Sequence, residues 1–274
     1  MSKYLISIST FKKNDALTNL IESLISTGAL EDSFIHISDD NNSGAKEVFD
    51  HFFATFPKSF GYSTSPRMGI WGNKNRGIYY FLERNKEPEY CLLLDDDIIS
   101  VGSGLCQEFE AASKFSGQQQ LSSYLGDADM VAAGRNKEDE ILQNGFFKTF
   151  PIVAENEYLY WCGGAQGIAC FYTRELLQKL GYMDNLGGPY GYEHALHAAR
   201  ALRIQGFCPE LFPMIKRSPN FFKTQLIPNA YDVDMVKVEG IQKTNYLKRL
   251  TETYQGYNLN VSKPGFNPKK EIII

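Results

Sequence analysis

The first hundred residues alternate between two patterns of apolar positions. Short apolar runs, typical of strands, occur at YLISI (4–8), SFIHIS (33–38), FGYST (60–64) and YCLLL (90–94). Apolar positions at helical spacing occur in NDALTNLIESLISTG (14–28), AKEVFDHFFATF (45–56) and NRGIYYFLERN (75–85). Strands that alternate with helices predict an α/β fold, with a mainly parallel sheet flanked by helices and right-handed crossovers.

After residue 97 the pattern is less regular. The candidates there are a loop over 116–129, a strand at MVAAG (130–134), a stretch without period over 135–157, a strand at GIACFY (167–172) and helices at TRELLQKLG (173–181) and EHALHAARALRIQG (193–206). The tail is rich in proline and asparagine and has one helical stretch, IQKTNYLKRLTETY (241–254). We expect one domain over residues 1–212 and a C-terminal extension or lid over residues 213–274.

The composition narrows the class of protein. A chain of 274 residues with 43% hydrophobic residues can bury one large core. The net charge of -4 and the lack of a Lys or Arg run argue against a nucleic-acid partner. Five cysteines without a CxxC pair indicate neither a disulfide framework nor a zinc knuckle, and they suit a reducing cytosol. No apolar run approaches the roughly 20 residues of a membrane span, so we expect a cytoplasmic chain, with peripheral attachment to the inner membrane face left open.

Three consecutive aspartates follow the fourth strand candidate, in CLLLDDDIIS (91–100). Adjacent carboxylates at a partly buried strand end destabilise the protein unless a cation lies among them. In an extended backbone Asp95 and Asp97 point to one side and Asp96 to the other. Two carboxylates on one side suit Mg²⁺ or Mn²⁺, which retain open positions for phosphate oxygens.

Other polar clusters also follow predicted strands. Thr10 and Phe11 follow the first strand, and Asp39 and Asp40 follow the second. In an open parallel sheet, ligands bind beyond the carboxyl ends of the strands, so one crevice would collect these side chains and the three aspartates. SDDNNSG is equally typical of an ordinary turn. In GNKNRGI (72–78), Lys74 is a candidate for contact with a phosphate. An ordinary helix start with solvated charged side chains is an equally good interpretation of this segment.

The late segment EHALH (193–197) contains half of the four histidines. On a helix, Glu193 and His194 lie near His197, so a general base is one interpretation. The alternative is structural, with His197 a hydrogen-bonded core residue and His194 a solvated first-turn residue. A zinc pair of the two histidines lacks evident further ligands.

Taken together, these segments resemble a family-2-type glycosyltransferase of the GT-A fold, a Rossmann-like sheet flanked by helices. The resemblance covers roughly residues 3–206. The matching segments are ISISTFKKNDALTNLIESL, SDDNNSG, GNKNRGIYYFL, the DxD-type LLLDDDI, and GG…GYMDN…YGYEHALHAAR. It implies a nucleotide-binding half over residues 1–100 and an acceptor half over residues 101–212.

The resemblance also implies roles for single residues. Thr10 and Phe11, with Asp39 or Asp40, would hold the nucleotide base, usually uridine. Lys74, Asn75 and Asp96 would contact the donor. Asp95 would lie near the ribose and sugar, and Asp97 with Asp95 would hold the metal. For the acceptor the residues are Trp161, Gly163 and Gly164. In the family a Glu-Asp pair opens a late helix and its aspartate is the base; here the pair is Glu193 and His194, which leaves the base open between these two.

The implied activity is a metal-dependent transfer, with Mn²⁺ or Mg²⁺, of a hexosyl group from a nucleotide sugar such as a UDP-sugar. The acceptor is a glycan or a lipid-linked glycan, the anomeric carbon is inverted, and the pathway is surface polysaccharide biosynthesis. Two alternatives stay open. A nucleotidyltransferase usually has a Gly-rich phosphate loop, which ISISTFKKND lacks. The other is a catalytically degenerate nucleotide-sugar binding module. It would explain why His194 replaces the aspartate of the family's Glu-Asp pair, and why no histidine follows His197 to complete a metal site.

Overall fold

A computed structural model describes residues 2–125, 147, 150–187, 192–225, 235–256, 259–263 and 272–273. The strand expected at residues 130–134 lies outside this part of the chain. The helices and strands expected in the first hundred residues are confirmed, with shifts of a few residues at their ends.

The N-terminal half forms a parallel sheet in the order β3-β2-β1-β4. Its strands are β1 (Tyr4–Thr10), β2 (Ser33–Asp40), β3 (Phe60–Ser65) and β4 (Tyr90–Asp95). The intervening helices are α1 (Asn14–Ser26), α2 (Ala45–Thr55) and α3 (Ile70–Tyr79), which continues as the π-helix η2 (Tyr80–Arg84). All seven residues of β1 are buried because helices cover both faces of the sheet.

The second half extends this sheet mostly with antiparallel strands. Its elements are β5 (Ile98–Ser100), α4 (Leu105–Ser116), β6 (Gln120–Ser122), β7 (Ile152–Glu155), β8 (Leu159–Cys162), β9 (Ala169–Thr173), α8 (Arg174–Leu180), α9 (Glu193–Ile204), β10 (Phe212–Ile215), β11 (Phe222–Thr224), α10 (Met235–Tyr254) and β12 (Ile272–Ile273). The described strands form a ten-stranded sheet, β12-β3-β2-β1-β4-β9-β6-β10-β8-β7, and a two-stranded sheet of β11 and β5. The α/β architecture is therefore a mixed sheet, parallel where strands and helices alternate.

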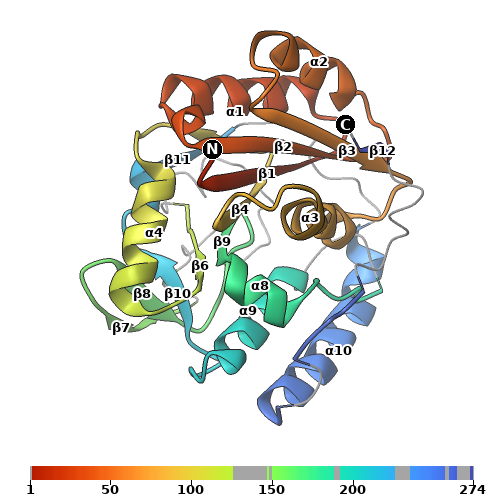
Figure 1. Cartoon of the computed structure of the whole chain (residues 1–274). Coiled ribbons are helices and arrows are strands. Elements are labelled where there is room, and N and C mark those ends of the chain that lie inside the picture. Colours follow the sequence, from red (N-terminus) through yellow and green to blue (C-terminus); the bar gives the residue numbers. More distant parts are fainter. Residues whose placement is uncertain are drawn as a thin grey trace.

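Two apolar clusters occupy the two faces of the sheet. The larger one joins the buried faces of α1, α2 and α4 to the strands, and the other joins α3 and α8 to β4 and β9. Figure 1 shows α1 and α2 on one side of β1–β3, and α3, α8 and α9 on the other side. The result is a three-layer arrangement with helices on both faces of the sheet.

Several elements of the second half were not expected from the sequence. Strands β6, β8 and β10 have only three or four residues each, which is too short for a period-2 pattern. They are strands because they pair with one another and with β9 inside the sheet. Strand β6 lies inside residues 116–129, where we expected a loop, so this expectation is corrected: pairing with β9 overrides local polarity.

The chain after residue 212 contributes strands to the sheets. Strand β10 crosses the expected boundary between residues 212 and 213, and β11 and β12 pair with β5 and β3. The segment is thus joined to the main sheet by β10 and β12, and to the two-stranded sheet by β11. The division at residue 212 falls within a strand whose four residues are all buried.

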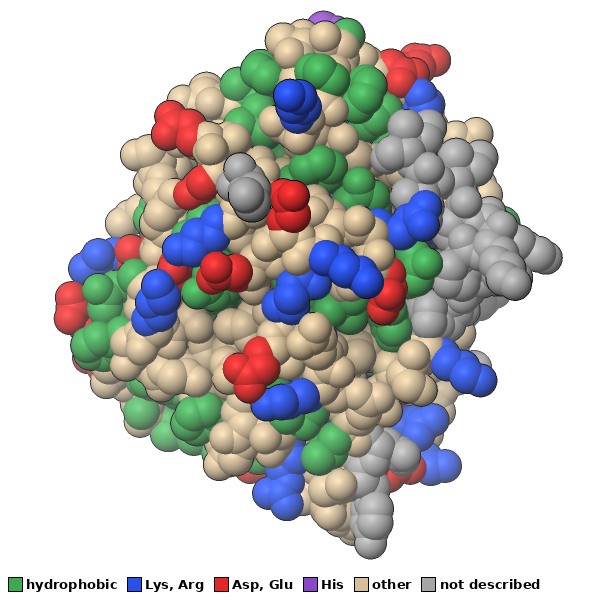
Figure 2. Space-filling view, viewed as in Figure 1, with side chains coloured by type: hydrophobic (Ala, Val, Ile, Leu, Met, Phe, Trp, Pro, Cys, Tyr) green, Lys and Arg blue, Asp and Glu red, His purple; other side chains and the backbone are tan. Residues whose placement is uncertain are grey.

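The surface and the cysteines agree with a globular chain. Figure 2 shows Lys and Arg side chains interspersed with Asp and Glu side chains over the face in view. All five cysteines are free; four are buried, as expected of core thiols, and Cys208 is exposed. In the part of the chain that the structure describes, no helix combines the length and apolar character needed to cross a membrane.

Candidate active site

Three strand ends meet at one edge of the parallel sheet. The register pairs Thr10 of β1 with Asp39 of β2, and Ser9 with Asp95 of β4. This brings together the polar clusters that follow β1, β2 and β4 in the sequence. The polar side chains expected at the carboxyl ends of the strands therefore lie at one edge of the sheet, and a ligand crevice there stays a prediction.

Asp95 is paired with a buried lysine from α3. Lys74 Nζ lies 3.1 Å from Asp95 Oδ1 and donates a hydrogen bond to the Gly167 carbonyl at 2.5 Å, and its side chain is 1% exposed. Burial alone would lower the pKa of Lys74, but the charge of Asp95 raises it above its ordinary value. Lys74 is therefore a buried cation that neutralises Asp95.

Asp96 points to α1 and has a different partner. It accepts a hydrogen bond from Thr10 Oγ1 at 2.7 Å, and Lys13 Nζ lies 3.3 Å from its Oδ1. Burial raises the pKa of Asp96 to about 6, although Lys13 opposes this shift. The protein thus supplies one lysine to Asp95 and another to Asp96.

The charge of Asp97 acts on Asp95 across the turn. Burial raises the pKa of Asp95; Lys74 opposes this shift, and the charge of Asp97 adds to it. Gln225 ties down the turn, because its backbone N–H donates to the Asp97 carbonyl at 2.8 Å and its Nε2 donates to the Ile98 carbonyl at 2.7 Å. No sequence motif indicated Gln225, which reaches the turn from the chain after β11.

The carboxylate oxygens at this turn are suitable ligands for a hard divalent cation. Mg²⁺ and Mn²⁺ are commonly held by one or two carboxylates, with phosphate oxygens and waters completing the shell. Within the described residues, no group of three His, Cys, Asp or Glu side chains is arranged to hold a metal ion. Asp95 and Asp97 would therefore contribute two ligands, and a bound diphosphate would supply more.

Glu193 and His194 begin helix α9 beside this turn. His194 Nδ1 lies 3.6 Å from Glu193 Oε1, and His194 Nε2 lies 3.2 Å from the Ala165 carbonyl. Glu193 is 4% exposed, yet its pKa is lowered, because His194 and Lys74 outweigh the effect of burial. The same His194 also stabilises the charged form of Asp95. One buried cation, Lys74, therefore connects the aspartate turn with the start of α9.

A glycine makes room for this arrangement. A Cβ atom on Gly167 would lie 2.8 Å from the ring of His194. Gly167 also provides the carbonyl that binds Lys74. The loop before β9 thus fixes both Lys74 and His194, and this glycine was not singled out from the sequence.

Asp39 and Asp40 are both engaged in loop hydrogen bonds. Asp39 accepts from Ser43 Oγ at 2.6 Å and from Tyr62 OH at 2.9 Å. Asp40 accepts from the backbone N–H groups of Met68 at 2.8 Å and Gly69 at 3.0 Å. These bonds shape the loops after β2 and before α3, as expected of turn formers. A direct contact with a nucleotide base stays a prediction for both residues.

Asn75 points away from the aspartates. Its Nδ2 donates to the Met183 carbonyl at 2.9 Å, and its Oδ1 accepts from the Met183 N–H at 2.7 Å. The side chain is fully buried. Asn75 therefore holds the segment before α9 against α3, and its contact with the donor stays a prediction.

Phe11 lies at the same edge as Thr10 and has a cationic neighbour. The guanidinium of the exposed Arg67 lies over the Phe11 ring, 4.6 Å from its centroid. An aromatic ring beside a guanidinium is a suitable surface for a planar base and a phosphate. Arg67 precedes α3 in SPRMG, and its place near Phe11 could not be seen in the sequence.

The residues expected at the acceptor lie on β8 and the loop that follows it. Trp161 is half-buried and pairs with Pro213 of β10. Gly163 is exposed, whereas a Cβ atom on Gly164 would clash with the Phe150 ring at 2.5 Å. Their role in acceptor binding stays a prediction.

His197 is a core residue. Its Nδ1 lies 3.0 Å from Tyr172 OH and its Nε2 lies 3.2 Å from the Gly181 carbonyl. Burial lowers the pKa of His197 to about 3, so the ring is neutral. The structural interpretation of this histidine is confirmed.

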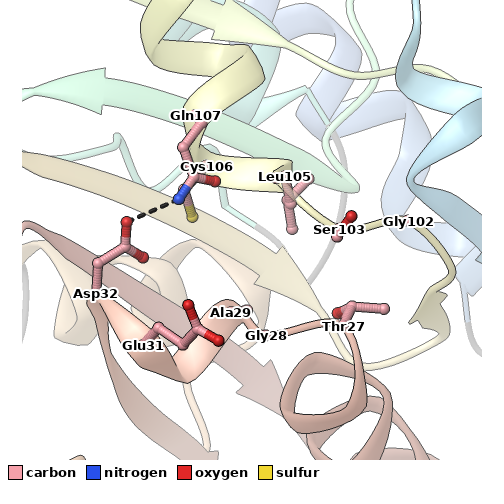
Figure 3. Close-up of a pocket in the computed structure, with 11 residues that line it drawn as sticks. Thr27, Gly28, Ala29, Glu31, Asp32, Gly102, Ser103, Leu105, Cys106 and Gln107 are labelled. Atoms are coloured by element: carbon pink, nitrogen blue, oxygen red, sulfur yellow. Dashed lines mark hydrogen bonds between the residues drawn. The ribbon is translucent and has the colours of Figure 1, made fainter.

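A cavity of about 160 Å³ lies far from this edge. Figure 3 shows residues 27–32 on one side and residues 102–107 on the other, with Gln107 bonded to Asp32. It adjoins the end of α1, whereas Lys13 at the start of α1 contacts Asp96. The 13-residue helix is roughly 20 Å long, so the cavity is separate from the aspartate turn.

Comparisons with known proteins identify the fold. No protein-family model matches the sequence, and no curated protein sequence matches it either. Among solved structures, the mannosyltransferase PcManGT from Pyrobaculum calidifontis, in complex with GDP-Man and Mn²⁺, has a TM-score of 0.56 at 12% identity, over 97% of this chain and 67% of that one. Residues 1–349 of TarS from S. aureus, in complex with UDP, have a TM-score of 0.54 at 13% identity, over 93% and 72%.

A third structure, GalNAc-T7 with UDP, GalNAc and Mn²⁺, has a TM-score of 0.60 at 11% identity, over 93% of this chain and 49% of that one. The first of these is named a mannosyltransferase, and the other two are complexes with UDP. At such identities the likeness establishes the architecture, and the expected GT-A fold is confirmed.

Proposed function

We propose that this protein is a glycosyltransferase that moves a sugar from a nucleotide sugar to an acceptor hydroxyl, with a divalent metal ion as cofactor. The observation that carries the proposal is the convergence of Asp95, Asp97, Lys74 and the Glu193–His194 pair at the carboxyl edge of a GT-A sheet. The named neighbours support it, since they include complexes with GDP-Man, UDP and Mn²⁺.

The donor would bind over the aspartate turn. Asp95 and Asp97 would hold the metal ion, which when bound offsets the charge that develops on a leaving diphosphate. Phe11, with Arg67 over its ring, offers a surface for the base, which we take to be uracil. Lys74 keeps Asp95 ionised and in place.

The acceptor hydroxyl would lose its proton to the start of α9. When His194 Nε2–H donates to the Ala165 carbonyl, Nδ1 is the nitrogen left to accept a proton. The Glu193 carboxylate, 3.6 Å from that nitrogen, would stabilise the resulting imidazolium. We therefore assign His194 as the base and Glu193 as the group that orients it.

Finer assignments follow from the same site. With the base on the acceptor side and the metal on the leaving-group side, a single displacement inverts the anomeric carbon. We further propose that the protein works in the cytoplasm, where nucleotide sugars are made, on a glycan or lipid-linked glycan of a surface polysaccharide. The choice between Mn²⁺ and Mg²⁺ is part of the test below.

The first experiment is a thermal-shift panel of UDP, GDP and their sugars, each with Mn²⁺, with Mg²⁺ and with chelator. A ligand that binds the native state alone raises the melting temperature. We expect stabilisation by a uridine nucleotide that requires metal and is lost in Asp97→Ala. Asp50→Ala, at an exposed aspartate on α2, is the matched control and should respond like the wild type. Metal-independent responses in all variants would contradict the proposed donor site.

A binding module without activity is the second candidate. It is favoured by His194, which stands where the resemblance implies a catalytic aspartate. Release of UDP from the stabilising UDP-sugar separates the two. Metal-dependent release that is lost in His194→Gln supports the enzyme, whereas binding without release supports the module.

A further inference from the structure

Helix α10 holds the start of α9 from outside the sheet. Tyr192, the residue before Glu193, stacks its ring on Tyr246 of α10, with centroids 4.9 Å apart and an angle of 22° between the rings. Both side chains are partly buried. Figure 1 shows α10 beside α9 at the edge of the molecule, and the two helices are in contact.

Tyr192 has a backbone conformation that a tyrosine rarely adopts. Its φ is 64°, in the left-handed region, at the N-terminal boundary of α9. Its carbonyl accepts the hydrogen bond from the Leu196 N–H at 2.9 Å, which closes the first turn. The direction in which Glu193 and His194 leave the backbone therefore depends on Tyr192 keeping this conformation.

The same face of α10 makes further contacts around α9. Asn245 Nδ2 donates to the Leu186 carbonyl at 2.9 Å. Arg249 and Glu252, four and seven residues after Asn245, interact electrostatically with the ion pair that Arg200 of α9 forms with Asp184. One stripe of α10 thus contacts the chain before α9, the start of α9 and its middle.

We propose that Tyr246 is a positioning residue for the transfer reaction. Through Tyr192 it fixes Glu193 and His194 against Lys74 and Asp95. This inference rests on the proposed function, because it assigns to α10 a part in placing the base. The C-terminal helix would then act on catalysis without touching the donor.

The test compares Tyr246→Ala, which removes the stacking ring, with Tyr246→Phe, which keeps it. Lys248→Ala, at an exposed position of α10, is the matched control. The assay measures UDP release from UDP-glucose, UDP-galactose and UDP-N-acetylglucosamine with Mn²⁺, with and without p-nitrophenyl glycosides as acceptor probes. We expect Tyr246→Ala to lower kcat about tenfold, since a small misplacement of a base is costly.

Donor binding should be unaffected. The KM for the UDP-sugar should stay within about twofold of the wild type, because the donor contacts lie on other elements. Tyr246→Phe and Lys248→Ala should keep the wild-type kcat. A loss of kcat in Lys248→Ala equal to that in Tyr246→Ala would overturn the proposal, and so would a rise in KM at unchanged kcat.

A double-mutant cycle isolates the pair. Tyr192→Gly removes the partner ring and leaves a residue that adopts positive φ freely. If Tyr246 acts through Tyr192, adding Tyr246→Ala to Tyr192→Gly should lower kcat no further. Independent, additive losses would overturn the proposed route.

Amide hydrogen exchange gives a readout that does not depend on activity. The amides of Leu196 and His197, the first that donate within α9, should exchange faster in Tyr246→Ala and at the wild-type rate in Tyr246→Phe. If the wild type releases no UDP from any donor, this exchange pattern would still support the positioning of α9 by Tyr246. The proposed glycosyltransferase activity would then be the part that is contradicted. Unchanged exchange in Tyr246→Ala would overturn the positioning role.

Discussion

Two lysines balance the run of aspartates at the end of β4. Lys74 lies against Asp95 and Lys13 against Asp96. An ionised carboxylate buried without a partner costs several kcal/mol, so these cations allow a charged turn at a buried strand end. Lys74 was expected to contact the donor; its Nζ already binds Asp95 and the Gly167 carbonyl, so a donor contact stays a prediction.

Buried neutral histidines give this protein a pH-dependent stability. His36 is fully buried, with Ser7 Oγ at 2.9 Å and Ser63 Oγ at 2.8 Å from its two ring nitrogens. Burial, with a contribution from Arg76, lowers its pKa to about 3. Below pH 6.5 the unfolded chain binds a proton that the folded chain does not. Neutral His36 therefore contributes to the free energy of unfolding above pH 6.5, and this contribution is lost as the pH falls towards 3.

We expect His36→Gln to be less stable than the wild type at pH 7 and less sensitive to acid. Between pH 7 and pH 5 its free energy of unfolding should fall by about 2 kcal/mol less than that of the wild type. Urea unfolding at pH 7, 6 and 5 measures the difference. His51→Gln, at an exposed histidine, should retain the wild-type pH dependence. Equal slopes in wild type and His36→Gln would contradict the assignment.

At the scale of elements, α3 is a polar helix inside the molecule. Residues 71–78, WGNKNRGI, are all buried. Arg76 donates to the Asp39 carbonyl at 3.1 Å, Asn75 binds Met183, and Lys74 binds Asp95. Gly77 allows close packing, because a Cβ atom there would clash with the Ser7 side chain on β1. The helix thus connects three parts of the site by internal hydrogen bonds.

Asn75→Ala tests whether α3 supports the site through the segment before α9. Removal of both hydrogen bonds leaves the buried Met183 backbone groups unsatisfied, so we expect a loss of about 2–4 kcal/mol in the free energy of unfolding. Urea denaturation measures it, and Asn220→Ala, at an exposed asparagine just before β11, is the control. Wild-type stability combined with lower affinity for the donor would instead favour the direct donor contact predicted from the sequence.

At the scale of the molecule, the C-terminal segment completes the sheet. Strand β10 lies between β6 and β8, and its Met214 and Ile215 are fully buried. Strand β11 pairs with β5, directly after the aspartate turn, and Gln225 then bonds to that turn. Residues after 212 therefore support the site as well as the sheet.

Two truncated chains test this arrangement. A chain of residues 1–212 loses most of β10 and exposes the apolar faces of β6 and β8, so we expect no cooperative unfolding transition. A chain of residues 1–256 retains β10, β11 and α10 and should unfold cooperatively at a lower temperature than the full chain. Calorimetry measures both. A cooperative transition of the 1–212 chain at the wild-type temperature would support the boundary predicted from the sequence.

The sequence by itself determined the alternating half of the fold and the edge at which its polar side chains gather. Apolar periodicity, carboxylates at strand ends and helix-stop residues such as Gly28 are local signals. Each of them can be read from a short stretch of the sequence. The resemblance to GT-A glycosyltransferases added the fold, which the structure confirms.

The tertiary structure decided which of these residues meet. Lys74 was found to be the buried partner of Asp95, Asn75 to bind Met183, and Tyr246 to stack on Tyr192. Strands β6, β8 and β10 also form by pairing with one another and with β7 and β9. These contacts join residues far apart in the chain, and the packing of whole elements sets them, so local patterns contain no signal for them.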